Sequence, residues 1–411
     1  MERWFRLGVE RCAPSIVLPS ALPAMPPAGR TIVLGAGKAA AEMAAVAVRH
    51  IGWPVTGAVV ARYGHGASGP TGAVDVIEAG HPVPDENSAR AAAAILARAL
   101  AAGPDDLVLF MISGGGSALL AAPIDGVSLD EKRRITDYLV KSGAPIEDVN
   151  FIRRHLSKIK GGRLAAAADP ARQITYIISD VIGDRPQDVA SGPSISAAFD
   201  VPGALSLLTR LGWRPSRELE DAMAAEPVPA AASRPFAVLA TNGDALAAID
   251  REARRSGWRV INLGARIKGE ARRVGDEHAR LARSLRSSRI PTIILSGGEL
   301  TVRVEAGAGR GGPNLEYLAA MMLGAAGDDA ISALAGDSDG IDGTEDNAGG
   351  YFDGESMSRA ADLAFDPRAL LDSHDSYALF SGLGDLVVTG PTRTNVNDIR
   401  IIMVNANEYQ S

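Results

Sequence analysis

The sequence predicts an α/β protein of two domains, a doubly wound parallel domain followed by a smaller domain with a mixed sheet. Its 411 residues are many for a single hydrophobic core. Short β-rich runs alternate with alanine-rich helical stretches, which is typical of parallel sheets with crossover helices. A stretch rich in proline, alanine and serine, EPVPAAASRP at 226–235, separates the two halves. We therefore expect domains at residues 1–232 and 233–411.

The first half carries five runs that we expect to be strands, together with four helical stretches. The strands are expected at 31–35, 55–62, 74–80, 106–113 and 173–179. The helices are expected at 38–50, 88–102, 129–142 and 150–168. Asp85, Asn87 and Ser88 stand at the start of the second helix, and their side chains are of the type that caps a helix N-terminus. This alternation predicts a Rossmann-like doubly wound domain.

The second half restarts with β-rich runs, which we expect to be strands at 235–241, 258–264, 291–298, 300–305, 330–336, 385–389 and 398–404. The third and fourth of these runs are almost contiguous, which indicates a bend or a hairpin. A hairpin brings antiparallel strands into a sheet. We therefore expect a mixed sheet in the smaller α/β domain.

Composition excludes several classes of protein. Hydrophobic residues make up 46% of the chain and charged residues 22%, which is typical of a globular protein. We find no apolar stretch near the roughly 18 to 20 residues that span a bilayer, and no apolar signal core, so we expect a cytoplasmic protein without a membrane partner. The net charge of -7 argues against a nucleic-acid partner. Cys12 is the only cysteine, which excludes an internal disulfide. Separately, we expect a monomer or a homodimer.

The first predicted strand runs into GAGKAA, which satisfies the dinucleotide-binding pattern G-x-G-x-x-[G/A]. A Walker A loop is excluded, because Ile32 and Ala39 occupy positions that require glycine and a hydroxyl residue. The next strand ends in Arg62 rather than in an acid, which suits the 2′-phosphate of NADP. Two interpretations of Lys38 remain open: a solvated residue in a tight turn, or a cation that binds phosphate or carboxylate beside a helix N-terminus.

The fourth predicted strand runs into SGGGSALL, residues 113–120. Three consecutive glycines, Gly114, Gly115 and Gly116, allow backbone N–H groups to converge on one anion, and the following helix adds its dipole. Ser113 and Ser117 add hydroxyl donors. A plain flexible connection does not need three glycines, so we interpret this segment as a phosphate-binding turn.

Three further segments place charged groups beside glycines or strand ends. NFIRRHLSKIKGGRLA is basic and includes Lys160, and its glycine pair costs roughly 1 kcal/mol per glycine within a helix, which indicates close approach to an anionic ligand. The fifth strand runs into SDVIGD, which places Asp180 at a strand end. Arg310 stands between glycines before a predicted helix, either as a surface cation or as a group that neutralises a transferring phosphoryl group.

GDSDGIDGTEDNAGG at 336–350 follows a predicted strand and is rich in carboxylates. An EF-hand counted from Asp337 is excluded, because isoleucine and aspartate stand where it requires an acid and then glycine. Asp337 and Asp339 form a D-x-D pair at the strand end with Asp342 close behind, and such oxygens beside phosphate suit Mg²⁺. The alternative is a loop of Asx turns and helix caps, which we favour from Glu345 onward.

Nine blocks, in order from about residue 30 to about residue 400, together resemble the class I glycerate 2-kinases, the MOFRL family. The blocks are GAGKAAAEM, GHPVPDENS, SGGGSALL, RRHLSKIKGGRLA, ISDVIGDRPQDVASGP, LSGGELTV, GRGGPNLE, GDSDGIDGTEDNAGG and TGPTRTNVNDI. The resemblance implies a Rossmann-like N-terminal domain, a smaller MOFRL domain, and ATP-dependent phosphorylation of D-glycerate at C2 with Mg²⁺. It also implies that Lys38 is the active-site lysine of the family and Arg310 its glycine-loop arginine.

The motifs and the resemblance combine in one hypothesis. ATP phosphates lie on the SGGGS turn and the basic segment, Mg²⁺ lies near the acidic loop, and Lys38 and Arg310 offset charge on the γ-phosphoryl group. Asp180 orients the attacking hydroxyl. Two alternatives stay open: an NAD(P)H-dependent hydroxypyruvate reductase, favoured by Arg62 and the dinucleotide pattern, and a sensor that binds sugar acid or nucleotide without turnover.

Overall fold

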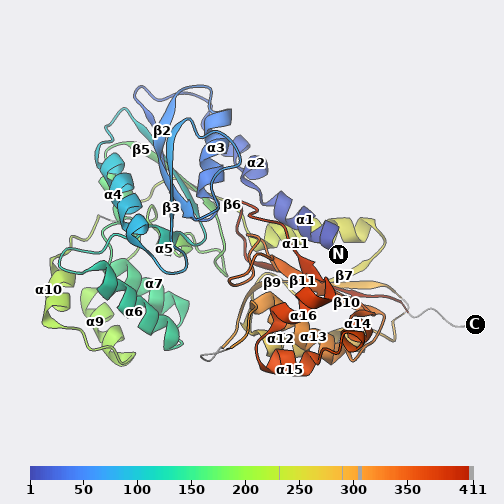
Figure 1. Cartoon of the computed structure of the whole chain (residues 1–411). Coiled ribbons are helices and arrows are strands. Elements are labelled where there is room, and N and C mark those ends of the chain that lie inside the picture. The colour runs from blue at the N-terminus through green and yellow to red at the C-terminus, as the bar shows by residue number, and fades with distance from the viewer. Residues whose placement is uncertain (231, 289, 304–307, 407–411) are drawn as a thin grey trace, which may run out of the picture. The chain divides into compact units, whose positions relative to one another are not determined.

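A computed structural model describes residues 1–230, 232–288, 290–303 and 308–406, which fold as two compact units (Figure 1). One unit comprises Pro14–Leu239 and is called the Rossmann-like unit below. The other comprises Met1–Ala13 with Ala240–Ser411 and is called the C-terminal unit. The expected ranges 1–232 and 233–411 divide the chain near the same point, but they group Met1–Ala13 with the other half.

The Rossmann-like unit is built on a six-stranded sheet in the order β3-β2-β1-β4-β5-β6. Its strands are β1 (Thr31–Ala36), β2 (Val55–Arg62), β3 (Ala73–Ala79), β4 (Leu107–Ser113), β5 (Arg172–Ile178) and β6 (Phe236–Ala240). The first five pair in parallel. In this order the progression of strands reverses between β1 and β4, as in dinucleotide-binding folds. The predicted doubly wound sheet is confirmed.

Helices cover both faces of this sheet (Figure 1). α4 (Glu86–Leu100) buries Ile95 in a cluster with Leu34 and Phe110, while α3 (Ala40–His50) lies on the opposite side. The predicted capping of α4 is confirmed. The Asp85 side chain accepts a hydrogen bond from the Ser88 amide, and the Ser88 hydroxyl accepts one from the Asp85 amide. The short helical segments of this part are α2 (Pro14–Val17), η1 (Pro19–Ala21), α5 (Gly116–Leu119), α8 (Arg163–Ala167) and η2 (Val189–Ser191).

A separate group of helices extends the Rossmann-like unit beyond its sheet, at the lower left of Figure 1. It comprises α6 (Leu129–Lys141), α7 (Ile146–His155), α9 (Val201–Arg210) and α10 (Arg217–Ala225). These helices are amphipathic, and they bury their own apolar cluster, which includes Ile135, Ile152 and Leu208. The buried face of α6 and α7 also carries charged residues, among them Lys132 and Arg154.

The C-terminal unit is built on a mixed sheet in the order β12-β11-β10-β13-β9-β7, with β8 beside β9. Its strands are β7 (Arg259–Asn262), β8 (Ile267–Glu270), β9 (Thr292–Thr301), β10 (Ile331–Asp337), β11 (Gly349–Phe352), β12 (Leu386–Val387) and β13 (Asp398–Val404). β7 and β8 run parallel to β9, and the other pairs are antiparallel. The predicted mixed sheet is confirmed.

Helices also cover both faces of the second sheet. α12 (Ala271–Ser284) and α13 (Pro313–Ala325) pack together on one face, and α11 (Asn242–Arg255) lies on the other. The remaining helices of this unit are α1 (Glu2–Arg11), α14 (Ser356–Asp362), α15 (Pro367–Asp372) and α16 (Ser376–Leu383). α1 packs on α11, and its Phe5 is fully buried against Gly336 of β10.

Glycines in close packing account for two departures from the sequence-based predictions. The runs 291–298 and 300–305, expected to form a bend or a hairpin, share one strand, β9, in which Gly298 has a φ of +124°; residues 304 and 305 lie outside the described residues. A Cβ at Gly297 would lie 1.7 Å from Asn242 Oδ1. The expected helix at 150–168 is interrupted, because Gly161 and Gly162 adopt positive φ and a Cβ there would press on Phe199 and Ser196. The run at 235–241, expected in the second sheet, is β6 and lies beside β5 in the first sheet. The strands β8 and β11 were not predicted.

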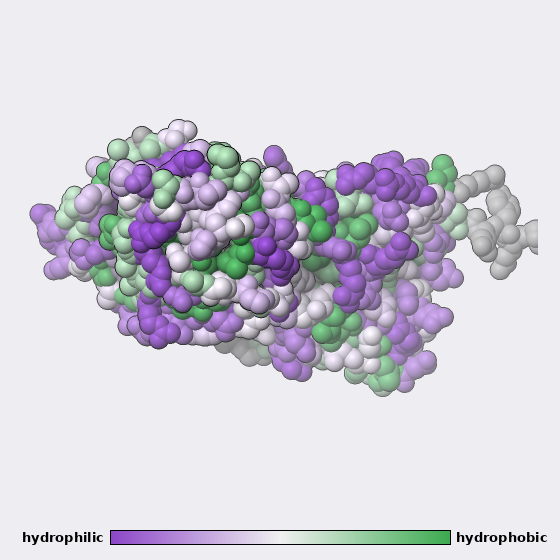
Figure 2. All heavy atoms as spheres, turned by 90° about the horizontal axis from the view of Figure 1, so that it is seen from above, coloured by the Kyte–Doolittle hydropathy of each residue, from purple (hydrophilic) through white to green (hydrophobic). Residues whose placement is uncertain are grey.

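The surface gives no sign of a bilayer-spanning helix. Among the described residues, no helix combines the length and the apolarity needed to cross a membrane. Figure 2 shows hydrophilic residues interspersed with smaller hydrophobic groups over the face that it presents.

Candidate active-site residues

The carboxyl ends of β1 and β4 are neighbours, and the two glycine turns that follow them are locked together. The Lys38 amide donates to the Gly114 carbonyl over 2.8 Å, and the Ala39 amide donates to Ser113 Oγ over 2.9 Å. Gly37 has a φ of +132°, and a Cβ at this position would lie 2.2 Å from Ser113 Oγ. Because only glycine tolerates this approach, the sequence fixes the two turns as one unit.

The side chain of Lys38 packs across the second turn. Gly115 has a φ of +78°, and a Cβ there would lie 3.2 Å from Lys38 Cγ and 3.1 Å from His81 Nε2. Lys38 and the SGGGS turn are therefore brought together, as the sequence predicted. His81 joins them without having been predicted; the available signal was its position directly after β3, at the same edge of the sheet.

A strained turn forms a wall of this region. Ala190 and Ser191 in η2 have φ values of 53° and 60°, which costs non-glycine residues about 1 to 3 kcal/mol each. Ser191 Oγ lies 2.9 Å from Ser117 Oγ and donates to Asn150 Oδ1 over 3.0 Å. These bonds hold the Ser117 hydroxyl in place. Backbone strain of this kind concentrates at ligand sites, where the surrounding structure enforces it.

Lys160 is buried behind the glycine turn rather than displayed on a helix. Its Nζ donates to the Ser117 carbonyl over 2.9 Å and lies 3.4 Å from the carbonyls of Leu120 and Ala190. Burial, followed by the neighbouring cations Lys132, Arg153 and Arg154, lowers the pKa of Lys160 well below its usual range. Lys160 thus ties the SGGGS turn to the strained turn, and it does so from the inside.

Much of the remaining basic segment is used in internal ion pairs. Arg154 is paired with Asp188, Lys158 Nζ lies 2.5 Å from Asp125 Oδ1, and Arg163 Nε lies 3.7 Å from Glu226 Oε1. The predicted phosphate-binding face of a continuous helix is therefore not formed. Arg153 differs, because no carboxylate pairs with it among the described residues.

Asp180 lies two residues beyond the end of β5. Ile178 is the register partner of Ser113, so Asp180 stands at the same edge of the sheet as the SGGGS turn. The side chain of Asp180 is half-buried. This placement brings it to the edge that carries Lys38, as expected for parallel strands.

An open groove lies farther along this edge, beside the ends of β2 and β3. Its volume is about 550 Å³, within the range of ligand sites. The polar side chains that line it are Tyr63, Thr71, Glu78, Asn87 and Arg90. Tyr63 is held by a 2.7 Å bond to Asp85 and a 2.8 Å bond from Asn87.

In the C-terminal unit, Arg310 is displayed by a loop that packs against the start of α16. The Arg310 amide donates to Asp375 Oδ1 over 3.2 Å, and its carbonyl accepts the Tyr377 amide over 2.9 Å. Its side chain is 64% exposed, with the guanidinium 4.8 Å from the Tyr377 ring and 3.4 Å from Glu345. The backbone of Arg310 is thus fixed while its charge stays at the surface.

The acidic loop begins with two Asx turns at the end of β10. Asp337 Oδ1 accepts the Asp339 amide over 2.9 Å, and Asp339 Oδ1 accepts the Ile341 amide over 2.8 Å. Asp337 is half-buried, whereas Asp339 is fully buried. Thr392 closes the loop from the other side, donating its amide to the Asp339 carbonyl over 3.1 Å. Turn chemistry therefore extends over the first half of the loop as well.

Asp342 caps α13. Its Oδ1 accepts the Asn314 amide over 3.0 Å, and its Oδ2 accepts the Leu315 amide over 2.9 Å. Burial raises the pKa of Asp342 to about 7, against the lowering effect of these amides. Both carboxylate oxygens are engaged, so the helix already accounts for this residue.

Asp398 is an acid that the sequence analysis missed. It opens β13 directly opposite Asp337, accepts from Asn314 Nδ2 over 2.8 Å and pairs with Arg400 at 2.5 Å. Burial raises the pKa of Asp398, and Arg400 opposes this. Only the antiparallel register of β10 and β13, which the sequence does not reveal, brings it beside the acidic loop.

The acidic loop fits a magnesium ion only in part. Within the described ranges, no three His, Cys, Asp or Glu side chains are arranged to hold a metal ion. Mg²⁺ often takes one or two carboxylates and completes its shell with water and substrate phosphate oxygens. Asp337 and Asp339 lie two residues apart at the end of β10, whereas both oxygens of Asp342 cap α13, so Asp342 suits that smaller role least.

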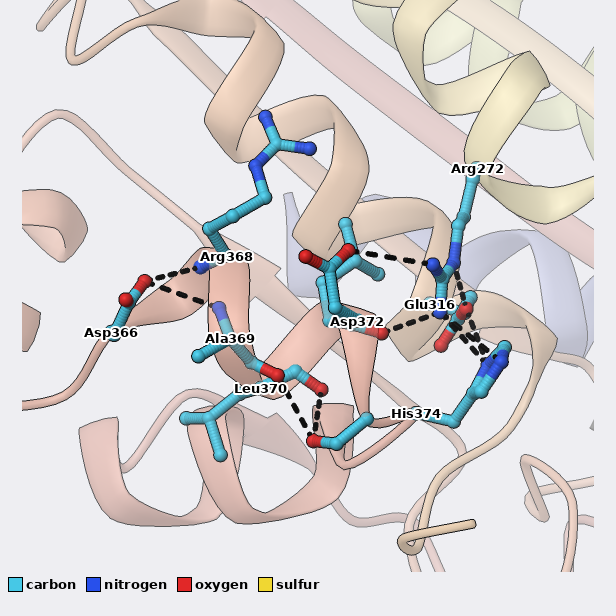
Figure 3. A network of polar contacts seen from close by, with 10 residues as sticks. Arg272, Glu316, Asp366, Arg368, Ala369, Leu370, Asp372 and His374 are labelled. Carbon is cyan, nitrogen blue, oxygen red and sulfur yellow. Dashed lines mark hydrogen bonds and ion pairs between the residues drawn. The ribbon is translucent and has the colours of Figure 1, made fainter. Parts of the chain in front are cut away.

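A second buried ionic network in the C-terminal unit has a structural role (Figure 3). Glu316 of α13 accepts from Arg272 Nε over 2.5 Å, and its Oε1 lies 2.9 Å from His374 Nδ1. Arg272 also donates to the Leu371 carbonyl and lies 3.7 Å from Asp372. The network joins α12, α13 and α15, and its charges neutralise one another.

Two family models match this chain. One, described as a domain of unknown function (DUF4147), matches residues 1–224, and the other, the MOFRL family, matches residues 292–398. The second match contains Arg310 and the acidic loop. The first contains both glycine turns, so each predicted group of site residues lies within a matched segment.

Named relatives cover nearly all of the chain. A protein of Agrobacterium vitis, provisionally named hydroxypyruvate reductase, is 43% identical over 98% of this chain and 94% of its own. The D-glycerate 2-kinase of Thermotoga maritima is 34% identical over 91% of both chains. The glycerate 2-kinase of Pyrococcus horikoshii is 36% identical over 92% of this chain and 88% of its own.

Solved structures share the fold. The crystal structure of glycerate kinase from Thermotoga maritima superposes with a TM-score of 0.86 at 33% identity, covering 98% of each chain. A crystal structure of a Pyrococcus horikoshii protein superposes with a TM-score of 0.77 at 32% identity and the same coverage.

Proposed function

We propose a function from one premise: this chain belongs to the class I glycerate 2-kinase family, which carries the MOFRL domain. The proposed reaction transfers the γ-phosphoryl group of ATP to the C2 hydroxyl of D-glycerate. The observation that carries it is the locked pair of glycine turns between β1 and β4, with Lys38 across the second turn. Open α/β sheets bind anionic ligands at this position.

The SGGGS turn is the proposed seat of the ATP phosphates. Its glycines leave room for backbone N–H groups to approach an anion, and the bond between Ser117 and Ser191 holds the turn in place. Lys160 supports the turn from behind through the Ser117 carbonyl. The groove beside β2 and β3 has the volume for a nucleoside at the same edge.

The proposed chemistry is an in-line transfer. A bond forms between the C2 oxygen and the γ-phosphorus as the bond to the β–γ bridging oxygen breaks, and the hydroxyl proton leaves to Asp180 or to water. Such a reaction depends mainly on positioning and on neutralising charge. We assign Lys38 and Arg310 to that neutralisation and Asp180 to orienting the hydroxyl.

Magnesium is part of this proposal through Asp337 and Asp339, which would hold it together with phosphate oxygens. When bound, the ion offsets the negative charge of the phosphates. Asp342, whose oxygens cap α13, is the weakest of the three predicted ligands.

A coupled assay tests the proposed activity. The purified chain should consume ATP only when D-glycerate and Mg²⁺ are present, and NMR of the product should place the phosphate on C2. Oxidation of NADPH with hydroxypyruvate, without ATP consumption, would instead support the reductase. Ligand binding without either turnover would support a sensor.

Two variants test the cations. Lys38→Ala and Arg310→Ala should each lower kcat by roughly 10²- to 10³-fold, the usual cost of removing a group that stabilises the transition state. Arg273→Ala, which removes an exposed cation paired with Glu277 on α12, is the control and should keep normal turnover. Near-normal turnover in either test variant removes that residue from the mechanism.

The relatives that are named kinases favour this reaction. The reductase is favoured by the dinucleotide pattern after β1, by Arg62 at the end of β2, and by the Agrobacterium vitis relative that carries that provisional name. The expected cytoplasmic location and the expected monomer or homodimer remain predictions. Size-exclusion chromatography with light scattering tests the second.

A further inference from the structure

A small cavity in the Rossmann-like unit lies behind the glycine turn, among α5, α6 and α7. Its volume is about 30 Å³. Its charged and hydroxyl-bearing lining residues are Ser117, Lys132, Thr136, Arg153 and Lys160. The other lining residues are Pro82, Pro84, Ala118 and Ala121. The cavity therefore has three cationic side chains, two hydroxyl groups and no acid.

Lys132 is the residue that makes this arrangement unusual. It lies on α6 with 4% of its surface exposed, and its Nζ has no hydrogen-bond partner within the part of the chain that the structure describes. Burying an ammonium group without a partner is costly, so such groups are ordinarily paired. Burial, followed by Arg153 and Arg163, lowers the pKa of Lys132 to about 7.

Arg153 adds a second cation without a counter-charge. Among the described residues its only hydrogen bond is a 3.5 Å contact with Asn150 Oδ1, and no carboxylate pairs with it. Burial lowers the pKa of Arg153 to about 10. The next residue on α7, Arg154, is paired with Asp188. The chain thus supplies an acid for one arginine of the pair and leaves the cavity-lining one unneutralised.

Lys160 completes the charge of the cavity. Its hydrogen bonds go to carbonyl oxygens and not to a carboxylate, so none of these contacts supplies a counter-charge. An anion within the cavity would offset all three cations, and charge-assisted hydrogen bonds to it would be roughly twice as strong as neutral ones. A cavity needs about 10 to 15 Å³ per water molecule, so this one holds two or three waters or the oxygens of one small group.

We propose that this cavity is a binding site for one small oxyanion, held by Lys132, Arg153 and the hydroxyl group of Thr136. Two sources share this chemistry, a carboxylate of the hydroxy acid and a phosphate group of the nucleotide. Ser117 belongs to both the cavity and the SGGGS turn, which links the site to the neighbouring turn. The choice of source rests on the proposed function, whereas the anion site itself does not.

Calorimetric titration of the whole chain with inorganic phosphate tests the site without requiring turnover. Lys132→Met should weaken phosphate binding by at least about tenfold, which corresponds to one close charge contact. Lys141→Met is the matched control on α6, because Lys141 is exposed and paired with Asp137; it should bind phosphate as the wild type does. Unchanged binding in Lys132→Met, or none in the wild type, overturns the proposal.

Thermal unfolding distinguishes this role from a structural one. In a buffer without phosphate or sulfate, Lys132→Met should melt at the same or a higher temperature, because it removes a desolvated charge among like charges. Added phosphate should then raise the melting temperature of the wild type only. A lower melting temperature in the variant, with the phosphate effect retained, assigns Lys132 to structure and overturns the proposal.

Titrations with D-glycerate and with ADP identify the source of the anion. Weaker D-glycerate binding in Lys132→Met supports a carboxylate, and weaker ADP binding supports a phosphate group. If only inorganic phosphate is affected, the site binds an adventitious ion only, and the proposal fails. Arg153→Gln repeats each comparison from α7, so the test does not depend on the folding of one variant.

Discussion

The two units bury charge in opposite ways. Glu316 in the C-terminal unit is 3% exposed at its side chain; Arg272 donates to it, and His374 lies 2.9 Å from it. Lys132 in the Rossmann-like unit is equally buried and has no carboxylate beside it in the described structure. A buried charge that the fold neutralises holds helices together, whereas one that it leaves unneutralised is available to a ligand. Four changes to these regions test that distinction.

The largest effect on stability should come from breaking the neutralised network. Glu316→Gln removes the charge that Arg272 and His374 share, and removing one partner of a buried ion pair costs about 3 to 5 kcal/mol. Denaturant unfolding should report this loss. Glu277→Gln breaks the exposed pair with Arg273 on α12 and should cost no more than about 0.5 kcal/mol. Equal losses of unfolding free energy in Glu316→Gln and Glu277→Gln would contradict a structural role for the buried network.

The unneutralised cation should instead make stability rise with pH. The folded pKa of Lys132, about 7, lies below its unfolded value near 10.5, so between these values the unfolded chain binds more protons. The wild type should therefore gain about 2 to 4 kcal/mol from pH 7 to pH 10 relative to Lys132→Met. The basic groups facing Lys132 are Arg153, Lys160 and Arg163. Burial lowers the pKa of all three, that of Arg153 to about 10, and all three are present in both proteins. If the stabilities of the wild type and of Lys132→Met change equally with pH, Lys132 is not a buried, unpaired ammonium group.

A buried histidine provides an intermediate case, because His278 is paired with a hydroxyl group rather than an acid. Its Nδ1 lies 2.8 Å from the Tyr317 hydroxyl, and burial, followed by Arg400, lowers its pKa to about 4. Since the unfolded value is near 6.5, stability should fall as pH drops from 6.5 to 4. Between pH 6.5 and pH 4, the loss of unfolding free energy should be about 1 to 2 kcal/mol smaller in His278→Leu than in the wild type. The pH dependence of the melting temperature should report this difference. Identical slopes would show that another group dominates.

The smallest effect is expected at an exposed pair close to the cavity. Lys158 and Asp125 are 2.5 Å apart, but the Asp125 side chain is 91% exposed. Lys158→Ala should change stability by less than about 1 kcal/mol and should leave phosphate binding unaltered. A large loss of phosphate binding would extend the anion site beyond the cavity defined here.

Local sequence predicted the strands of the Rossmann-like unit to within about a residue, because each is a continuous apolar run bounded by glycine or polar residues. It also predicted that Lys38 and the SGGGS turn meet, since parallel strands bring their carboxyl ends together. β8, with the sequence IKGE, was missed because it is short and polar. Its strand conformation depends on pairing with β9, which no local pattern reveals.

The sites that escaped prediction depend on contacts distant in sequence. LDEKRRITDYLVK has the pattern of an amphipathic helix with a solvated charged face, and nothing within it marks Lys132 as buried. Its environment is set by α7 and by Pro82 and Pro84, which pack around it in the fold. Asp398 is similar, because only the register of β13 with β10 places it opposite Asp337.

The position of α1 has a consequence for synthesis of the protein. Trp4 packs edge-on against Trp258, and Phe5 packs on Gly336, so this helix binds partners that are synthesised more than two hundred residues later. Because synthesis adds about 5 to 20 residues per second, the apolar face of α1 remains without these partners for on the order of tens of seconds. The Rossmann-like unit, a contiguous insertion of Pro14–Leu239, can complete its own core during that interval. Synthesis of the C-terminal unit therefore begins before that of the Rossmann-like unit and is completed after it.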